Sequence, residues 1–325
     1  MSKEYFLTQK VTVNKKDIAI EHIHSCSYIE PASMEGVKLI LEIVDHTGLY
    51  RDDYGLQEKA EIEVTFADPD GRGDDVWIQK FIVAKPTTKD GLLTINAFGK
   101  DTYELKKPVN SPRFFTNMQP KTILAELLPN LTIVSDTFEK GATYHLNSGG
   151  TKSRLIRSMA RDFGAACFIC RGKVYFVALK NMPMTEQFKL ENGNPNAEFS
   201  FPRYSIIGER DLYERVLNKT YLSWDTVNGM EQAKNGSQGA GTLISVHQTK
   251  ALNNQHIAIV PILEIELGGN SKFMPLSCCS VLFHKPLPAS ELDETLPETQ
   301  IINQVTHYQR GNRYLCHLEL GVRNL

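Results

Sequence analysis

Residues Gly150–Lys180 read GTKSRLIRSMARDFGAACFICRGKVYFVALK and contain three groupings that could do chemistry: a near-match to a phosphate loop, a CxxC pair and a row of arginines. A phosphate loop needs a glycine directly before its lysine and another five residues earlier, so that backbone N–H groups wrap the phosphates. Here Thr151 and Leu146 occupy those two positions ahead of Lys152. The stretch therefore predicts a strand, a loop and a helix start without a nucleotide cradle.

The CxxC pair consists of Cys167 and Cys170, and its setting argues against redox or zinc chemistry. Such pairs need both sulfurs on one side, whereas residues three apart on a strand point to opposite faces. No second CxxC or spaced histidine pair completes four ligands. The six cysteines include the adjacent Cys278 and Cys279, which is not a spacing suited to bridging. We predict reduced, mostly buried thiols rather than a disulfide framework.

Two acidic stretches also resemble binding sites only in part. Asp68–Asp75 (DPDGRGDD) looks like half of a calcium loop, but Arg72 stands where an oxygen ligand is expected and Gln79 replaces the closing glutamate. We predict an acidic hairpin turn. The carboxylates of residues 291–298 lie in a proline-punctuated loop, which would hold an acid–base pair poorly, so we predict a solvated loop.

Histidines are the remaining residues that could hold a metal or act in catalysis. His22 and His24 would share a face of a strand, yet no third metal ligand is identifiable, and we predict a surface or interface pair. The same interpretation is given to His307 and His317. No GxSxG, HExxH or recognisable Cys/His spacing appears. The sequence thus predicts no catalytic residue, no cofactor and no metal site.

The chain as a whole has the composition of an ordinary globular protein. It has 325 residues, of which 41% are hydrophobic and 23% charged, with a net charge of −2. That length favours two or three domains. No apolar run approaches the ~18–20 residues that cross a bilayer, the N-terminus has no apolar signal core, and no basic stripe suggests nucleic-acid binding. We therefore predict a chain that is cytoplasmic when made and does not insert into membranes.

Period-two alternation predicts that both ends of the chain are β. In the first segment Leu39, Leu41 and Ile43 alternate with their neighbours, and similar runs recur between turn signals. Strand-like alternation returns from about Tyr204. Further along this segment, Pro261 indicates an edge or a bulge in its strand. A hydrophilic stretch over residues 225–242 is predicted to be a mobile loop.

The segment between them is predicted to be α+β. Lys121–Leu128 (KTILAELL) forms a short helix, and a second helix begins at a cap on Thr151 or Ser153 and ends at Gly164, where a left-handed residue is wanted. Two strands then join through a tight turn at Arg171-Gly172. The predicted fold is mainly β with an α+β middle domain.

The helix–glycine–hairpin pattern resembles a known architecture. The order "LIRSMARDFGA, strand, RGKVYFV" over Leu155–Phe176 is similar to the middle segment of the phage tail and baseplate hub family, which includes the late control protein D group and the N-terminal part of type VI secretion spikes. The helix KTILAELLP resembles the short helix that precedes it. Val216–Trp224 (VLNKTYLSW) resembles the strand that opens the family's second barrel, and VTHYQRGNRYLCHLEL resembles its closing hairpin. These are apolar-and-glycine patterns rather than a catalytic fingerprint.

The resemblance implies a division into three domains and a structural role. Residues 1–108 would form a first antiparallel β-barrel, residues 109–203 the α+β middle domain, and residues 204–325 a second β-barrel. Three chains would make a pseudo-sixfold ring that adapts the sixfold tail tube to the threefold spike or tail tip. Tape measure protein and DNA would pass through its channel without specific binding, and the protein would reside in the virion tail after assembly in the host cytoplasm.

The partners implied are a distal tail or tube protein on one side and a spike or tail tip protein on the other. Arg154, Arg157 and Arg161, on the outer side of the second helix, are the candidate partner-binding residues; a solvated helix face is the alternative. Two other functions remain open. A receptor- or carbohydrate-binding tail protein should show an aromatic platform, for which Trp77 and Trp224 are few and scattered. A hydrolase would need a deep pocket with perturbed carboxylates.

Overall fold

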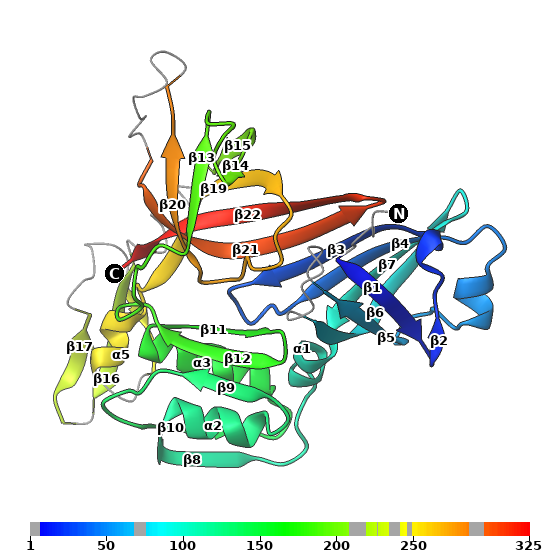
Figure 1. Ribbon diagram of the computed structural model, residues 1–325. Helices are drawn as coiled ribbons and strands as arrows, with labels where there is room; N and C mark the ends of the chain where they lie inside the picture. Colours follow the sequence, from blue (N-terminus) through cyan, green and yellow to red (C-terminus); the bar gives the residue numbers. More distant parts are fainter. Residues whose placement is uncertain are drawn as a thin grey trace.

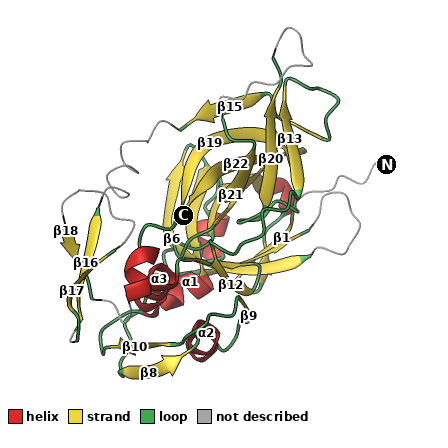
Figure 2. Ribbon diagram, turned by 90° about the vertical axis from the view of Figure 1, so that its left-hand side faces the viewer, coloured by secondary structure: helices red, strands yellow, loops and turns green. Residues whose placement is uncertain are grey.

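The computed structural model describes residues 7–67, 76–207, 219–225, 227–233, 241–245, 249–285 and 296–325. Strands dominate and most pairs are antiparallel, which confirms the predicted mainly β fold (Figure 1). Two of the helices, α2 (Pro120–Leu127) and α3 (Lys152–Phe163), belong to the middle segment, and α3 lies above α2 in the view of Figure 2. None of the helices in the described ranges is both long and apolar enough to cross a membrane.

The N-terminal region is a curved antiparallel sheet in the order β3-β4-β7-β6-β5-β1-β2. Leu39, Leu41 and Ile43 of β4 are fully buried while their neighbours are only partly so, as the alternation predicts. Tyr28 and Phe66 stack in the same core, with ring centroids 4.6 Å apart. Its elements are β1 (Thr8–Val13), β2 (Lys16–Asp17), η1 (Ile20–His22), β3 (Ile23–Pro31), β4 (Lys38–Val44), η2 (Leu49–Asp53), β5 (Glu61–Phe66), β6 (Trp77–Lys89), β7 (Leu92–Gly99) and α1 (Lys100–Leu105).

The middle segment packs two helices between two small sheets, β8-β10 and β9-β12-β11. The Thr151 side chain accepts a hydrogen bond from the Arg154 N–H and caps α3, and Gly164 ends it with φ +59°. Arg171 and Gly172, both with positive φ, form the two-residue turn between β11 and β12. The elements are β8 (Arg113–Met118), α2 (Pro120–Leu127), β9 (Thr132–Ser135), β10 (Ala142–Leu146), α3 (Lys152–Phe163), β11 (Ala165–Cys170) and β12 (Lys173–Ala178).

The C-terminal region is built on the long hairpin β21–β22, which β19 and β20 extend on either side. Pro261 lies at a register shift in β19, beyond the part of that strand that β15 covers, so the predicted bulge is present. The elements are β13 (Phe188–Asn192), β14 (Phe199–Ser200), β15 (Arg203–Ile206), β19 (Ala258–Gly268), β20 (Cys278–Phe283), β21 (Thr299–Arg310) and β22 (Arg313–Asn324).

The two end regions share one sheet, because β21 pairs with β3 from Gln304↔Pro31 to Gln309↔Cys26. The strand order therefore runs without interruption from β14 to β2 (Figure 1). In addition, β13 and β14 come from the predicted middle segment but pair with β20 and with each other in the C-terminal part of that sheet. The boundaries at 108 and 203, and closure into two barrels, stay predictions.

Two expectations for the stretch after residue 215 are wrong. The strand predicted to open a second barrel is β16 (Thr220–Asp225), and it pairs instead with β17 (Gly229–Gln232) and β18 (Gly241–Leu243) in a separate sheet beside α5 (Thr249–Asn254). Residues 216–218 lie outside the described residues. β17 and part of β18 also fall in the predicted loop, because Asp225 accepts hydrogen bonds from two turn N–H groups and folds the chain back at Gly229. Residues 226 and 234–240 of that predicted loop lie outside the described residues.

Candidate functional site

The residues that first suggested chemistry are used for structure. Lys152, of the near-miss phosphate loop, donates to the Leu127 carbonyl at 2.8 Å and so ties α3 to α2. Cys167 lies 3.7 Å from the Met34 sulfur in the middle core, whereas Cys170 points the other way, toward Glu30. The opposite orientation of the two thiols is as predicted.

The remaining candidates form no metal site in the part of the chain that the structure describes. His22 lies 2.6 Å from the Tyr50 hydroxyl, and all six cysteines are free and buried. The predicted acidic turn at Asp68–Asp75 lies outside the described residues, as do residues 291–295 of the second acidic stretch, whereas Glu298 accepts from Ser280 at 2.9 Å.

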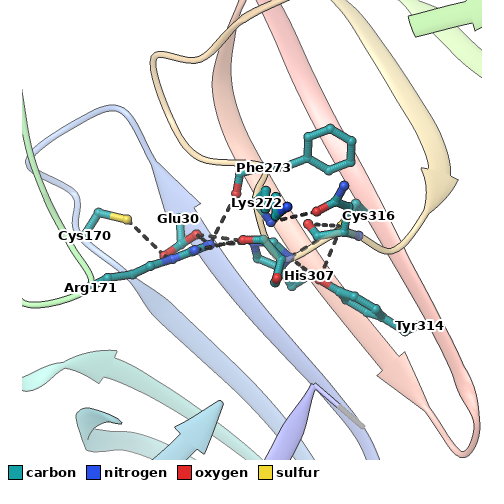
Figure 3. A network of polar contacts seen from close by, with 10 residues as sticks. Glu30, Cys170, Arg171, Lys272, Phe273, His307, Tyr314 and Cys316 are labelled. Atoms are coloured by element: carbon teal, nitrogen blue, oxygen red, sulfur yellow. Dashed lines mark hydrogen bonds and ion pairs between the residues drawn. The ribbon is translucent and has the colours of Figure 1, made fainter. Parts of the chain in front are cut away.

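One prediction about the histidines is wrong. His307 is fully buried on β21 and is not a surface residue, whereas the side chain of His317 is about half exposed. The reason is the pairing of β21 with β3, which places His307 opposite Tyr28 inside the continuous sheet. It belongs to a buried polar cluster, called here the junction, that joins all three segments (Figure 3).

The junction centres on Glu30 of β3 and Arg171 from the β11–β12 turn. Arg171 donates from Nε to Glu30 Oε1 at 3.0 Å and from Nη2 to Oε2 at 2.9 Å, a bidentate pair. It also donates from Nη1 to the Ser271 carbonyl at 2.8 Å, and its guanidinium lies 4.2 Å from the centre of the Trp77 ring. One side chain of the middle segment therefore holds both end regions.

His307 extends the junction into the C-terminal hairpin (Figure 3). Its Nε2 lies 3.3 Å from Glu30 Oε2, its Nδ1 lies 2.7 Å from the Tyr314 hydroxyl, and the Cys316 sulfur is 3.4 Å from Nδ1. Both ring nitrogens have partners, which is what a buried histidine requires.

The electrostatics of the junction favour fixed charges. Burial by itself raises the pKa of Glu30, but the charge of Arg171 and hydrogen bonds from His307 and Arg171 hold that pKa well below its usual value. Burial lowers the pKa of His307, yet the Cys316 sulfur and the Glu30 carboxylate raise it to about 9. Burial, with the Glu30 charge, raises the pKa of Cys170 far above its usual value, so its sulfur is a thiol and a poor nucleophile.

These features suit a clamp better than a catalytic centre. The side chains of Glu30 and His307 have no exposed surface and that of Arg171 only 14%. A substrate would have to displace the paired groups to reach them. The junction fixes the orientation of the middle segment against the continuous sheet.

Arg171 and Glu30 were not predicted as site residues, although the sequence carries a signal for one of them. Cys26, Tyr28 and Glu30 are spaced two apart along β3 and therefore share one face of the strand, so the carboxylate falls on the buried face. A buried carboxylate needs a cationic partner. This spacing alone does not identify the partner, which comes from a turn 141 residues away.

The predicted partner-binding arginines lie elsewhere. Arg154, Arg157 and Arg161 are all exposed on α3, and no ion pair engages them within the described ranges. Arg157 and Arg161 border a cavity of about 300 Å³, here called the α3 groove, that runs between α3, β11 and the start of β19. Arg154 does not line it. The structure does not test their role in partner binding.

Neither a protein-family model nor a curated protein matches the sequence. The fold, however, is shared with tail proteins of phages and prophages and with a type VI secretion component. The expected likeness to the tail hub group is thus confirmed at the level of the fold, while identities of 8 to 12% establish no more than that.

The individual matches extend over nearly the whole chain. A tail protein from Neisseria meningitidis MC58 has a TM-score of 0.64 at 12% identity, with 96% of this chain and 95% of that one covered. The 43 kDa tail protein of prophage MuSo2 from Shewanella oneidensis gives 0.65 at 11%, covering 97% and 98%. An Escherichia coli type VI secretion component, described as similar to the T4 bacteriophage tail proteins gp27 and gp5, gives 0.58 at 8%, covering 98% and 80%.

Proposed function

We propose that the chain is a structural, non-enzymatic protein of a phage tail, acting as the hub of the tail tip or baseplate. The observation that carries this is the two-way coverage: two tail proteins match the chain over at least 95% of both lengths. The protein would reside in the virion tail.

The finer proposal is a trimer. Three copies would form a ring in which the two end regions of each chain give near-sixfold symmetry toward the tail tube or distal tail protein and threefold symmetry toward the spike or tail tip. The sheet continuous through β21 and β3, with the junction beside it, supports this because a ring of six similar units needs the two units of each chain held at a fixed angle.

The channel of that ring would pass tape measure protein and DNA without binding them. A net charge of −2 with interspersed signs supports this, since a basic lining would make phosphate contacts and slow the passage of DNA. A strongly basic channel in an imaged ring would contradict this part of the proposal.

The test is the mass of the purified chain in solution together with negative-stain images. A mass three times that of the 36.6 kDa chain and rings with a central hole are expected. A compact monomer whose surface binds sugars would instead favour a receptor- or carbohydrate-binding tail tip protein. For that function Trp77 is unsuited, since the Arg171 guanidinium lies over its ring, and Trp224, which is 65% exposed, lies opposite Met230 and not opposite another aromatic residue.

A further inference from the structure

The α3 groove has an apolar floor and a charged rim. Met34, Ala160 and Cys167 line it and are almost fully buried, so the floor is made of small or flexible apolar side chains. Arg157 and Arg161 line the same cavity and are exposed. The groove thus offers apolar contact below and positive charge above.

One wall of the groove is the open edge of a strand. Ala165, Ala166 and Cys167 are consecutive and all line it, as expected where a cavity follows the edge of a strand, because side chains alternate between its two faces. Among the residues that the structure describes, β11 is the outer strand of its sheet and pairs with β12 alone. The two-residue turn after Cys170 sets the hydrogen-bond alternation, so Ala166 bonds to β12 while the N–H and C=O of Cys167 point away from it. Within the described ranges no hydrogen bond engages that N–H.

The facing wall is another strand edge. Residues 257–259 at the start of β19 are also consecutive lining residues. β22 pairs with this strand on one side; on the other side, within the described residues, β15 pairs along Leu263–Glu266 and the Ile207 N–H donates to the Ile262 carbonyl. Open edges of this kind accept an added strand.

Within the described residues no ion pair neutralises the charge at the rim, although Glu35 lies near enough that Arg157 adds to the effect of Lys38 in lowering its pKa. Arg157 donates from Nε to the Ser153 carbonyl at 3.3 Å, and neither it nor Arg161 forms an ion pair with the described residues. Lys106 adds to the positive charge nearby: burial and the neighbouring Arg157 lower its pKa. No carboxylate is among the described residues that line the groove.

We propose that the α3 groove binds an extended, acidic segment of another tail component, a proposal that rests on the tail function above. The backbone of the segment adds to the edge of β11, its carboxylates contact Arg157 and Arg161, and its small apolar side chains lie on the floor. Arg154, on the same helix, takes no part because it does not line the groove.

The test uses the full chain and a fluorescein-labelled peptide of three Glu-Val repeats, with three Lys-Val repeats as the matched probe. Fluorescence anisotropy at low salt should detect the acidic peptide and not the basic one. The double variant Arg157→Glu/Arg161→Glu should weaken binding about tenfold for each arginine. The control Arg154→Glu should change it less than about twofold.

Hydrogen exchange distinguishes strand addition from simple charge attraction, since the acidic peptide should slow exchange of the Cys167 amide. The proposal is overturned by no binding at about 1 mM peptide, by equal binding of the basic peptide, by unchanged exchange at Cys167, or by an Arg154→Glu effect as large as that of the double variant. Solution mass is measured on the same samples. A trimer without peptide binding rejects the groove alone, and a monomer that binds peptide rejects the ring alone.

Discussion

Arg171 and the arginines of α3 are the same residue type in two opposite settings. Arg171 is buried, makes a bidentate pair with Glu30 and also donates to the carbonyls of Ser271 and Phe273. Arg157 and Arg161 are exposed and form no ion pair within the described part of the chain. The difference teaches that, in this fold, charge placed inside joins segments of one chain, whereas charge left at a groove rim remains available to another molecule.

The largest expected effect comes from removing the buried charge. Arg171→Met should lower the free energy of unfolding by about 3–5 kcal/mol, because Glu30 is left buried without its cationic partner. Urea denaturation followed by circular dichroism measures it. The double variant Glu30→Met/Arg171→Met should recover part of the loss. If the single variant is as stable as the parent, the junction does not hold the segments.

A change of pH should act on the junction in both directions. The pKa of Glu30 is lowered from 4.5 on folding, so its stabilisation is complete above that value and is lost as the pH falls. The pKa of His307 is raised from 6.5 to about 9, so its stabilisation is complete below 6.5 and is lost as the pH rises through 9. The urea midpoint should therefore be highest between about pH 5 and 6.5.

Glu30→Gln provides the control for that profile. In this variant the urea midpoint should fall less steeply as the pH is lowered, but it should still fall. The reason is Glu191, whose pKa is lowered to about 2 by hydrogen bonds from Asn194, Lys189 and His284, so that it also loses stabilisation in acid. An acid side that is equally steep in the variant would contradict the role given to Glu30.

A smaller effect is expected from two glycines with left-handed backbone: Gly164, which ends α3, and Gly172, in the turn between β11 and β12. Gly164→Ala should cost about 1–2 kcal/mol for its left-handed backbone and more for contact, since a Cβ there would lie 2.8 Å from Ile257 Cδ1. Gly172→Ala has a similar φ but open space around it, so it should cost the backbone strain alone. Thermal denaturation of the pair isolates the contact with Ile257; equal losses would deny it.

The smallest effect is predicted for the exposed arginines. Arg157→Glu and Arg161→Glu should each change the free energy of unfolding by no more than about 0.5 kcal/mol, as surface substitutions do. The same urea titration measures it. A loss near that of Arg171→Met would erase the distinction between the two settings.

Local features of the fold were predictable because their causes are local. The Thr151 cap, the left-handed Gly164 and the alternation along β4 each depend on a few neighbouring residues, and all appear where the sequence places them. The Arg171-Gly172 turn is equally local.

The features that could not be predicted depend on contacts between strands that are distant in sequence. His307 was assigned to the surface because nothing in its own strand reveals that β3 lies beside it. Likewise β16 has strand character whichever sheet it joins, and nothing in its own residues reveals that it pairs with β17 and β18 beside α5. Residue type indicated that the α3 arginines face outward, but only the three-dimensional structure separates Arg154 from the two that border the groove.

The pairing of β3 with β21 also has a consequence during synthesis. Glu30 and His307 are 277 residues apart, so at about 5–20 residues per second the ribosome completes the partner strand roughly 15 to 55 seconds after β3 has emerged. Throughout that interval the nascent chain carries one edge of β3 without its eventual strand partner, and until Arg171 is made, 141 residues after Glu30, the carboxylate also lacks its cationic partner. Chaperone binding or a pause before residue 299 would therefore act on this one strand more than on any other part of the first sheet.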